Sequence, residues 1–372
     1  MSKKLKVMTV VGTRPEIIKM SRVIEKLDSY FEHLLVHTGQ NYDYELNQIF
    51  FEELGVREPD VFLECNVDSV MCLIGDALHK VEKLIISHNP DAFLIYGDTN
   101  SCLSALAAKR NKVPIFHFEA GNRCFDPRVP EEINRKIVDH LSDVNFVLSE
   151  HARRYLISEG LRPDFIFKTG SHMYEIIESA KYDIEKSTIL ERLELLPEDY
   201  FLVSLHREEN VDDKDKIVSI LEALQVISGK YEKQIIFSTH PRTGKRIEEF
   251  GVKIPANLVF SKPFGFYDYC NLQKNAFCVI SDSGTITEET SILNLNSVML
   301  REMHERPEGV DVSAVCLSSL NTTALINSID ICINTNVTKK VEDYQNGEVS
   351  EMIIRIISSY IDIINREVWR KF

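Results

Sequence analysis

Short apolar runs alternate with longer stretches of helical periodicity along the whole chain. The runs are apolar at consecutive positions and rich in β-branched and aromatic residues, which is typical of parallel strands covered on both faces. Six lie in the first half and six in the second: LKVMTVV, HLLVHTG, AFLIYGD, IFHFE, VNFVLSE and FIFKTG, then FLVSLH, QIIFSTH, NLVFS, FCVISDSG, SVMLR and AVCLSS. The pattern predicts an α/β protein with two doubly wound domains of about six strands each.

The length of the chain also indicates two domains. A single hydrophobic core stops growing near ~250 to 300 residues, and this chain has 372. We expect a first domain over residues 1–170 and a second over residues 171–352, with the boundary near residues 168–185. Residues 353–372 show helical apolar spacing and are expected to form a last helix that packs on one of the domains.

Polar residues and glycines directly follow most of the predicted strands. They are Gly12, Gly39, Asp98, Glu119, His206, His240, Lys262 and the tripeptide Asp282-Ser283-Gly284. In open parallel sheets, ligands bind outside the carboxyl ends of the strands. Both domains offer polar groups at that edge, so we expect the functional site in a cleft between them.

The charge of the chain narrows the class of ligand. A formal net charge of −14 argues against a general binder of nucleic acid or of anionic membranes, because such surfaces need an excess of Lys and Arg. Any anionic ligand must therefore meet a local basic cluster. The amino terminus lacks the apolar core of a signal peptide and no run is long enough to span a membrane, so we expect a cytoplasmic protein. Its eight cysteines form no CxxC pair, which predicts neither a disulfide framework nor a zinc site.

The segment VVGTRPEIIKM reads as a strand, a tight turn and a helix start. Thr13 and Glu16 have the spacing of a capping box. Free backbone N–H groups at the turn, together with Arg14 and Lys19, predict an anion site. The alternative is an ordinary turn between a strand and a helix. The segment lacks the G-x-G-x-x-G pattern, so it does not indicate a dinucleotide cofactor.

The segment SDSGTITEETSIL repeats this arrangement in the second half. Ser283, Gly284 and Thr285 precede a helix, where a backbone can approach a phosphate closely. Glu288 has the spacing to close a capping box with Thr285, which a plain helix cap would also explain. Glu289 is then left for another partner, such as a ribose diol.

Carboxylates gather around the ends of two predicted strands in the first half. Asp98 ends AFLIYGD, where the simplest expectation is an N-cap for the Ala-rich helix that follows. Glu119 ends IFHFE, and a carboxylate at that place is harder to explain by capping.

A helix is predicted to begin at PEEINR. We expect Ile133, Ile137 and Leu141 on its inner face, with Glu131 and Arg135 together on the opposite face. This pair is either a solvated salt bridge or part of a site that faces the cleft.

Two histidines end apolar runs in the second half, in SLHREEN and STHPRT. A lone histidine is more often structural than catalytic. However, His206 and His240 occupy equivalent strand ends, and Arg207 and Arg242 follow them closely, which favours an anionic ligand. Arg306, in HERPEG, adds a further cation in a loop after a strand.

Taken together, these segments resemble the non-hydrolysing UDP-N-acetylglucosamine 2-epimerase family. GTRPEIIKM, GDT, EAGNR, PEEINR, HREEN, DSGTITEE and ERPE match its motifs in order over nearly the whole chain. The resemblance implies a glycosyltransferase-B-like architecture of two Rossmann-like domains, a UDP-sugar in the cleft, and a last helix that crosses back onto the first domain. It also implies a homodimer, with no cofactor and no metal.

Longer segments look like one branch of this family, which makes UDP-N-acetyl-L-fucosamine from UDP-N-acetyl-L-talosamine for capsule and O-antigen. They are HTGQNYDYELNQIFFEELGV, HFEAGNRCFDPRVPEEINRKIVDHLSDVN, KPFGFYDY, DSGTITEETSIL and HERPEG. The loop between Glu119 and Pro130 lacks the LYSPW-like segment of enzymes that act on UDP-N-acetylglucosamine. Asn41 and Tyr44 also stand where those enzymes often have His and Met.

The family mechanism explains the cluster of carboxylates and arginines. Loss of the C2 proton together with UDP yields a 2-acetamidoglycal, and UDP adds back with protonation on the other face, so two proton-handling groups are needed. The resemblance assigns Asp98, Glu119 and Glu131 as acid/base candidates and His206 as an aid to the departure of UDP. It assigns phosphate or sugar contacts to Arg14, Lys19, Arg135, His240, Ser283, Gly284 and Thr285, and a ribose contact to Glu289.

Three alternatives remain open from the residues. The first is that the substrate is the UDP-GlcNAc/UDP-ManNAc pair. A glycosyltransferase of the same architecture would use the UDP contacts without needing the carboxylates. A non-catalytic UDP-sugar binder would tolerate their loss.

Overall fold

In the computed structural model, the described residues are 4–40, 53–301, 303–335, 337 and 340–371. The chain divides into two compact units: unit 1 comprises Met1–Glu178 and Asp343–Phe372, and unit 2 comprises Ser179–Glu342. The end of the chain therefore belongs to the same unit as its beginning. Among the described helices, none combines the length and apolar character that crossing a membrane requires.

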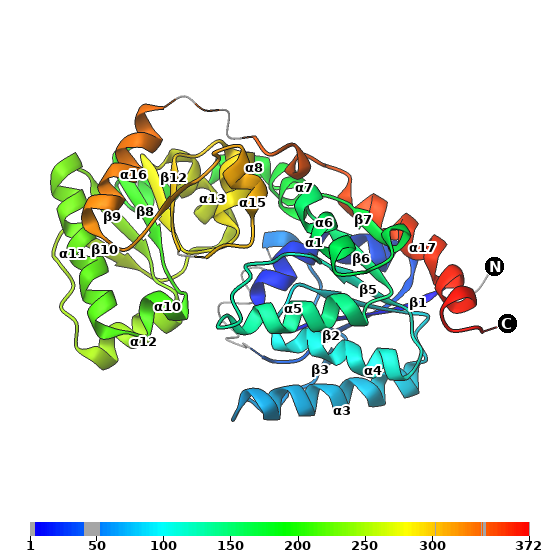
Figure 1. The fold of residues 1–372 in the computed structure, drawn as a ribbon. Helices are drawn as coiled ribbons and strands as arrows, with labels where there is room; N and C mark the ends of the chain where they lie inside the picture. The colour runs from blue at the N-terminus through cyan, green and yellow to red at the C-terminus, as the bar shows by residue number, and fades with distance from the viewer. Residues whose placement is uncertain (1–3, 41–52, 302, 336, 338–339, 372) are drawn as a thin grey trace. The chain divides into compact units, whose positions relative to one another are not determined.

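Unit 1 contains a parallel sheet of seven strands in the order β3-β2-β1-β4-β5-β6-β7 (Figure 1). The strands are β1 Lys6–Val11, β2 Glu32–His37, β3 Val61–Phe62, β4 Ala92–Tyr96, β5 Ile115–Phe118, β6 Val144–Val147 and β7 Ile166–Lys168. Six of them are the predicted apolar runs. The seventh, β3, has only two residues and pairs with the end of β2.

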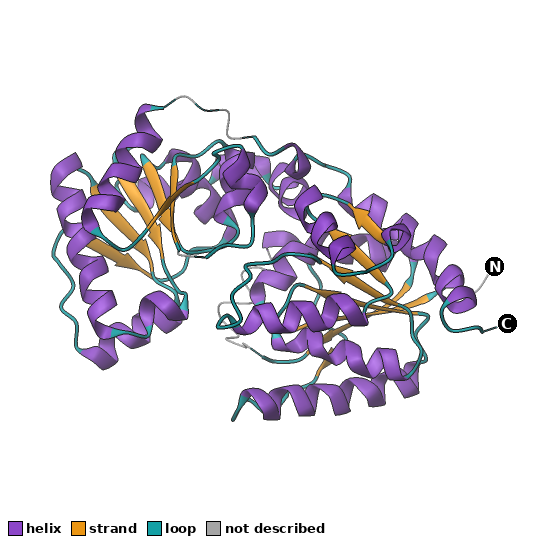
Figure 2. Ribbon diagram, viewed as in Figure 1, coloured by secondary structure: helices purple, strands orange, loops and turns teal. Residues whose placement is uncertain are grey.

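Helices cover both faces of this sheet (Figure 2). One face is covered by α3 Val70–His88, α4 Ala105–Arg110, α5 Pro130–Leu141 and α6 Glu150–Ser158. The other is covered by α1 Arg14–Tyr30, α7 His172–Ser179 and α17 Val349–Glu367. Short 3₁₀ segments are η1 Asn100–Ser104, η2 Pro163–Phe165 and η3 Glu342–Tyr344.

The last helix, α17, is an integral part of unit 1. It packs along α1, and its inner face buries Ile353, Ile357, Ile361 and Ile364. Lys26 Nζ on α1 lies 2.6 Å from Glu351 Oε1 on α17. Burial of four isoleucines contributes far more than this exposed ion pair, since exposed pairs contribute at most ~1 kcal/mol.

Unit 2 contains a parallel sheet of six strands in the order β10-β9-β8-β11-β12-β13. The strands are β8 Tyr200–Ser204, β9 Gln234–Ser238, β10 Leu258–Ser261, β11 Cys278–Ser281, β12 Ser297–Leu300 and β13 Cys316–Ser318. One face packs against α11 Lys214–Tyr231, α12 Pro241–Phe250 and α16 Thr322–Asn334. The other packs against α9 Ile189–Arg192, α13 Phe266–Asn275 and α14 Ile286–Leu293. The remaining helices are α8 Lys181–Lys186, α10 Glu208–Val211 and α15 Pro307–Asp311.

The strand order reverses at equivalent points in the two sheets. In unit 1 the order reverses between β1 and β4, and in unit 2 it reverses between β8 and β11. The turns that follow the carboxyl ends of these strands meet at such a switch point, which is where open α/β sheets bind ligands. The polar segments identified in the sequence therefore lie in the expected topological position within each unit.

Candidate functional site

The turn after β1 is closed by the buried carboxylate of Glu16. Its Oε2 accepts hydrogen bonds from Gly12 N at 2.6 Å and Thr13 N at 2.7 Å. The capping box predicted for Thr13 and Glu16 is therefore confirmed. The prediction that these N–H groups are free for an anion is wrong, because Glu16 already occupies them. Arg14 begins α1 immediately after this turn and is partly exposed.

Glu16 also fastens the turn after β1 to the turn after β4. Thr99 Oγ1 donates a hydrogen bond to Glu16 Oε1 at 2.8 Å. Burial raises the pKa of Glu16, while the hydrogen bonds from Gly12, Thr99 and Thr13 act against this rise. A Cβ at Gly12 would lie 1.9 Å from Ser101 Oγ, so no larger residue fits between the two turns. Gly12 is therefore required by packing.

Glu119 lies immediately after β5 in a left-handed backbone conformation, with φ of 62°. This conformation is uncommon for a residue with a side chain. Lys19 Nζ, from α1, lies 2.7 Å from Glu119 Oε2, and Asn122 Nδ2 donates to Glu119 Oε1 at 3.2 Å. Lys19 also lies over the ring of Tyr96, 5.4 Å from its centroid. The structure thus pairs two predicted site residues that are 100 positions apart.

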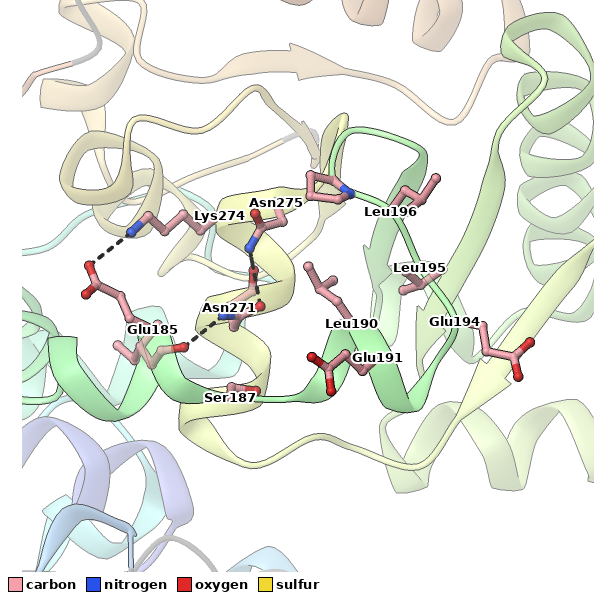
Figure 3. A pocket seen from close by; sticks show the side chains of 12 residues that line it. Glu185, Ser187, Leu190, Glu191, Glu194, Leu195, Leu196, Asn271, Lys274 and Asn275 are labelled. Carbon is pink, nitrogen blue, oxygen red and sulfur yellow. Dashed lines mark hydrogen bonds and ion pairs between the residues drawn. The ribbon is translucent and has the colours of Figure 1, made fainter.

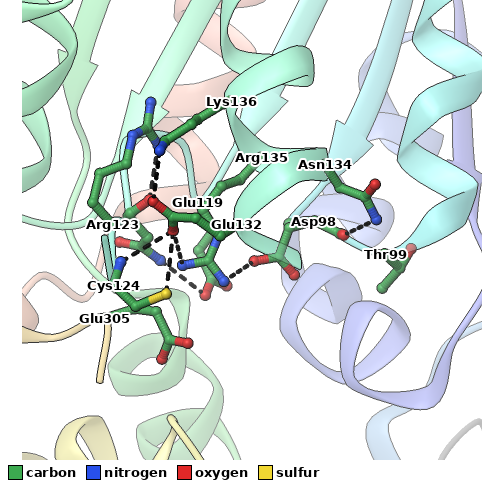
Figure 4. Close-up of polar contacts among 12 residues, drawn as sticks. Asp98, Thr99, Glu119, Arg123, Cys124, Glu132, Asn134, Arg135, Lys136 and Glu305 are labelled. Carbon is green, nitrogen blue, oxygen red and sulfur yellow. Dashed lines mark hydrogen bonds and ion pairs between the residues drawn. The ribbon is translucent and has the colours of Figure 1, made fainter. Parts of the chain in front are cut away.

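Asp98 is paired with Arg135 (Figure 4). Arg135 Nη2 lies 2.8 Å from Asp98 Oδ2, and Asn134 Nδ2 donates to the Asp98 carbonyl oxygen at 3.0 Å. Asp98 is not the N-cap of the Ala-rich helix α4, because Ser104 holds that position and Thr99 is the N-cap of η1 before it. The Asp98 side chain is 28% exposed, so it keeps access to a ligand.

The orientation predicted for α5 is wrong. Its inner face carries polar and charged residues along with Val138: Glu132, Asn134, Arg135 and Asp139 are buried. Ile133 and Ile137 are 52% and 44% exposed. Arg135 contacts Asp98 and Glu132, whereas the predicted arrangement placed it with Glu131 on the outer face. Glu131 itself is partly exposed at the start of the helix.

Glu132 holds the loop between Glu119 and α5. Its Oε2 accepts from Cys124 N at 3.1 Å, and its Oε1 accepts from Phe125 N at 3.3 Å (Figure 4). Lys136 Nζ lies 3.1 Å from Glu132 Oε1. The loop is therefore fixed by the helix that carries Arg135.

In unit 2, the side chain of Asp282, which directly follows β11, anchors the turn after β8. This carboxylate is fully buried and accepts hydrogen bonds from His206 N, Arg207 N and Asn210 Nδ2 at 2.9 to 3.0 Å. Its Oδ1 also lies 3.2 Å from His206 Nδ1. The rings of His206 and His240 lie 5.3 Å apart, so the two predicted histidines are neighbours.

The turn after β11 contains Ser283, Gly284 and Thr285. Ser283 Oγ and Thr285 Oγ1 form a hydrogen bond at 2.9 Å. A Cβ at Gly284 would meet only Glu305 Oε2 at 3.6 Å and Arg207 Nη2 at 4.0 Å, which are ordinary contacts. Neither packing nor a left-handed φ therefore requires glycine at position 284.

The capping role predicted for Glu288 is wrong. Thr285 makes no side-chain cap hydrogen bond, and Glu288 Oε1 instead lies 2.9 Å from Arg306 Nη2 in a buried ion pair. Glu289 Oε2 accepts a hydrogen bond from Gln273 Nε2, and the ribose contact of Glu289 stays a prediction. A second buried ion pair joins Arg301 to Glu305, four residues apart.

A cavity of about 670 Å³ in unit 2 lies away from these turns (Figure 3). Its lining includes Glu194 to Pro197, which precede β8, and Asn275, which precedes β11. It therefore lies at the amino ends of the strands, opposite to the edge that carries His206 and the turn after β11. Within the described part of the chain, no group of three or more His, Cys, Asp or Glu side chains is arranged to hold a metal.

The sequence interpretation gave no role to three buried carboxylates that organise the turns: Glu132, Asp139 and Asp282. Asp282 directly follows β11, and the sequence named it only as one of the polar residues at the strand ends. Glu132 and Asp139 lie on a helix face that the hydrophobic pattern assigned to solvent. Asn41 and Tyr44 lie outside the described residues.

Comparison with known proteins identifies close relatives over the whole chain. Residues 25–358 match the family profile described as UDP-N-acetylglucosamine 2-epimerase. The chain is 32% identical to the UDP-2,3-diacetamido-2,3-dideoxy-D-glucuronate 2-epimerase of Pseudomonas aeruginosa, over 95% of this chain and 99% of the relative.

Two epimerase structures are among the solved structures that resemble this one. The UDP-N-acetylglucosamine 2-epimerase of Rickettsia bellii has a TM-score of 0.92 at 51% sequence identity, over 99% of this chain and 100% of the other. The UDP-GlcNAc 2-epimerase of Methanocaldococcus jannaschii, crystallised with UDP-GlcNAc and UDP, has a TM-score of 0.89 at 36% identity, over 95% of this chain and 99% of the other.

Proposed function

Because this chain belongs to the UDP-N-acetylglucosamine 2-epimerase family, whose members are isomerases, we propose that it inverts C2 of a UDP-linked N-acetylhexosamine by eliminating UDP and adding it back. The observation that carries the proposal is the pairing of Asp98 with Arg135 and of Glu119 with Lys19 at one edge of the sheet of unit 1. A binding protein has no need to bury ion pairs around two proton-handling carboxylates.

Inversion at C2 requires two groups that exchange protons with opposite faces of the sugar. One carboxylate removes the C2 proton, the C1–O bond breaks, and its electron pair leaves with UDP to give a 2-acetamidoglycal. UDP then re-forms the bond to C1 while a second group protonates C2 from the opposite face. Asp98 and Glu119 have different cation partners and so lie in different environments, which is how acid and base roles become separated. Glu131, at the start of α5, is the third acid/base candidate.

Unit 2 supplies most of the contacts to UDP in this proposal. Gly284 is required neither by packing nor by φ, which leaves the close approach of a phosphate as the reason for glycine between Ser283 and Thr285. His206 faces this departing group and is oriented by Asp282. The remaining phosphate or sugar contacts are Arg14, Lys19, Arg135 and His240. Glu289, oriented by Gln273, binds the ribose.

We propose UDP-N-acetyl-L-talosamine and UDP-N-acetyl-L-fucosamine as the substrate pair, in capsule or O-antigen synthesis. Support comes from the branch-specific segments of the sequence and from the short loop that Glu132 closes after Glu119. The second candidate is the UDP-GlcNAc/UDP-ManNAc pair, which the name of the Rickettsia bellii relative favours. We also propose a homodimer, since Leu106 on α4 and Ile133 and Ile137 on α5 expose apolar surface.

Proton NMR in D2O tests the function and separates the two substrates. The protein is given UDP-GlcNAc in one tube and UDP-N-acetyl-L-fucosamine in another. We expect deuterium at C2 in the second tube only. Exchange in the first tube alone would assign the GlcNAc/ManNAc pair, and no exchange in either, with UDP still bound, would reject the epimerase.

The variant Glu119→Gln tests the role of the carboxylates. We expect turnover to be abolished and UDP binding to be retained, because the change removes the proton acceptor and leaves unit 2 untouched. The matched control is Glu82→Gln, on the exposed face of α3, which should turn over normally. Near-normal activity of Glu119→Gln would contradict the assignment.

A further inference from the structure

A second, fully buried group of charges lies on the face of the first sheet that α5 covers. Asp139 on α5 and His117 on β5 are 0% exposed, and Arg123 in the loop between them is 1% exposed. Arg123 Nη1 lies 2.7 Å from Asp139 Oδ2, and His117 Nδ1 lies 3.0 Å from Asp139 Oδ1. Arg123 also forms two parallel hydrogen bonds to Glu159, at 2.6 and 2.7 Å. None of these residues belongs to the acid/base set described above.

This buried group contacts the backbone on the Asp98 side. His117 Nε2 donates a hydrogen bond to the carbonyl oxygen of Gly97 at 2.7 Å. Gly97 has a φ of 67° and directly precedes Asp98. The hydrogen bond therefore fixes the peptide plane from which the Asp98 side chain departs.

The same group contacts the backbone and a side chain on the Glu119 side. The Gly121 N–H lies 3.2 Å from both oxygens of Asp139. Arg123 Nη1 donates to the Asn122 carbonyl oxygen at 2.8 Å, and the Asn122 side chain in turn holds Glu119 Oε1. A Cβ at Gly121 would lie 2.6 Å from the Ala152 carbonyl oxygen, so this turn cannot shift toward α6. The left-handed conformation of Glu119 is thus held from its carboxyl side.

A gain in stability alone does not explain why these charges are buried. Removing a charge from water costs several kcal/mol per ion, and well-packed apolar residues often replace a buried ion pair without loss. Burial by itself raises the pKa of Asp139, but His117 and Arg123 outweigh this and hold its pKa below the ordinary range. Asp139 is therefore an ionised carboxylate, which can accept hydrogen bonds from several donors at once.

We propose that Asp139, His117 and Arg123 are positioning residues that set the separation of the Asp98 and Glu119 carboxylates. The inference rests on the acid/base roles given under the proposed function. Asp139 joins the peptide before Asp98, the turn after Glu119, and the helix that carries Arg135. Two groups that work on opposite faces of one carbon need a fixed spacing, since a misplacement of ~1 Å can cost ~10²-fold in rate.

The test compares two buried aspartates of unit 1. Asp139→Asn keeps the size of the side chain and loses the charge, and we expect kcat to fall about 10²-fold with KM unchanged. Asp143→Asn is the control, because the side chain of Asp143 is only 2% exposed but binds Lys109 and Ile115 N at the opposite end of β5. We expect the control to lose thermal stability while keeping its kcat. Equal kcat values for the two variants would overturn the proposal.

Two substitutions of His117 serve even if Asp139→Asn fails to fold. The amide of Gln reaches the position of Nε2 and can still donate to Gly97, whereas the amide of Asn reaches only the position of Nδ1. We expect His117→Gln to retain most of its kcat and His117→Asn to lose it, although both lower the melting temperature. Equal impairment of the two would indicate a merely structural role and overturn the proposal.

The outcomes also separate this inference from the proposed function. Absence of C2 exchange in the wild-type protein would reject the function itself. Normal exchange in the wild type, together with an unchanged kcat for a folded Asp139→Asn, would reject only the positioning role.

Discussion

The substitution Asp282→Asn tests the buried carboxylate that holds the turn after β8 in unit 2. Asp282 is fully buried and accepts hydrogen bonds from His206 N, Arg207 N and the Asn210 amide. An ionised carboxylate only accepts, so it suits three donors. An asparagine has a single oxygen, and its NH2 group would face the N–H of His206, which lies 3.0 Å from both oxygens of Asp282.

The cost follows from those contacts. A hydrogen bond to a charged group contributes ~1.5 to 3 kcal/mol, and a buried donor left without an acceptor costs ~1 to 3 kcal/mol. With part of this relieved by local movement, we expect a loss of about 2 to 4 kcal/mol in the free energy of unfolding. For a domain of this size, that lowers the melting temperature by about 5 to 15 °C.

The same change acts on catalysis through His206. Its Nδ1 lies 3.2 Å from Asp282 Oδ1, and an amide no longer orients the ring or stabilises its protonated form. Loss of a positioned general acid costs about 10² to 10⁴-fold, so we expect kcat to fall at least about 10²-fold. Urea unfolding, steady-state kinetics and calorimetric binding of UDP measure the three effects, and UDP affinity should fall less than kcat.

The matched control is Asp330→Asn. Asp330 lies in the same unit and pairs with Lys230 and Tyr231, but its side chain is 41% exposed. We expect its melting temperature and kcat to stay close to the wild type. If Asp282→Asn unfolds at the same urea concentration as Asp330→Asn and has the same kcat, the role given to Asp282 is refuted.

Two further predictions concern unit 1. Burial lowers the pKa of His37 from 6.5 to about 4. As the pH falls through this range, His37 therefore binds a proton in the unfolded chain but not in the folded chain. The free energy of unfolding should be constant in this respect above pH 6.5 and should be lower by about 3 kcal/mol at pH 4. Urea unfolding at a series of pH values measures this loss, and the dependence on pH should be weaker in His37→Gln. Ile137→Glu places a charge on the exposed face of α5 and should convert the proposed dimer to monomer in light scattering, whereas Ile86→Glu on α3 should not; a dimer that survives Ile137→Glu places the interface elsewhere.

Much of the fold could be predicted from local pattern. All twelve predicted strands are present, and the α/β class is confirmed, because strands covered on both faces are apolar at every position. The missed strand, β3, consists of Val61 and Phe62. Two residues are too few to show any periodicity.

The orientation of α5 could not be predicted in the same way. The hydrophobic pattern placed Ile133 and Ile137 inside, but the structure buries Arg135 and Asp139 instead. Their partners are the turns after β4 and β5, and a pattern along one helix does not reveal ion pairs with distant turns. The surplus of charge at this strand edge was the only available signal.

The two expected capping boxes make the same point. Thr13 with Glu16 and Thr285 with Glu288 have identical spacing, yet only the first is formed. The carboxylate of Glu288 instead forms a buried ion pair with Arg306, 18 residues further along the chain. Local spacing shows that a contact is possible, and the tertiary partners decide whether it forms.

The return of α17 to unit 1 has a consequence for how the protein is made. Translation proceeds at about 5 to 20 residues per second, so roughly 10 to 40 s separate the synthesis of Glu178 from the end of the chain. During that time the surface of α1 that α17 covers lacks its partner, and all of unit 2 is synthesised before α17. The first half of the protein to leave the ribosome is therefore the last to finish folding, and it has the greatest need of protection by chaperones while synthesis continues.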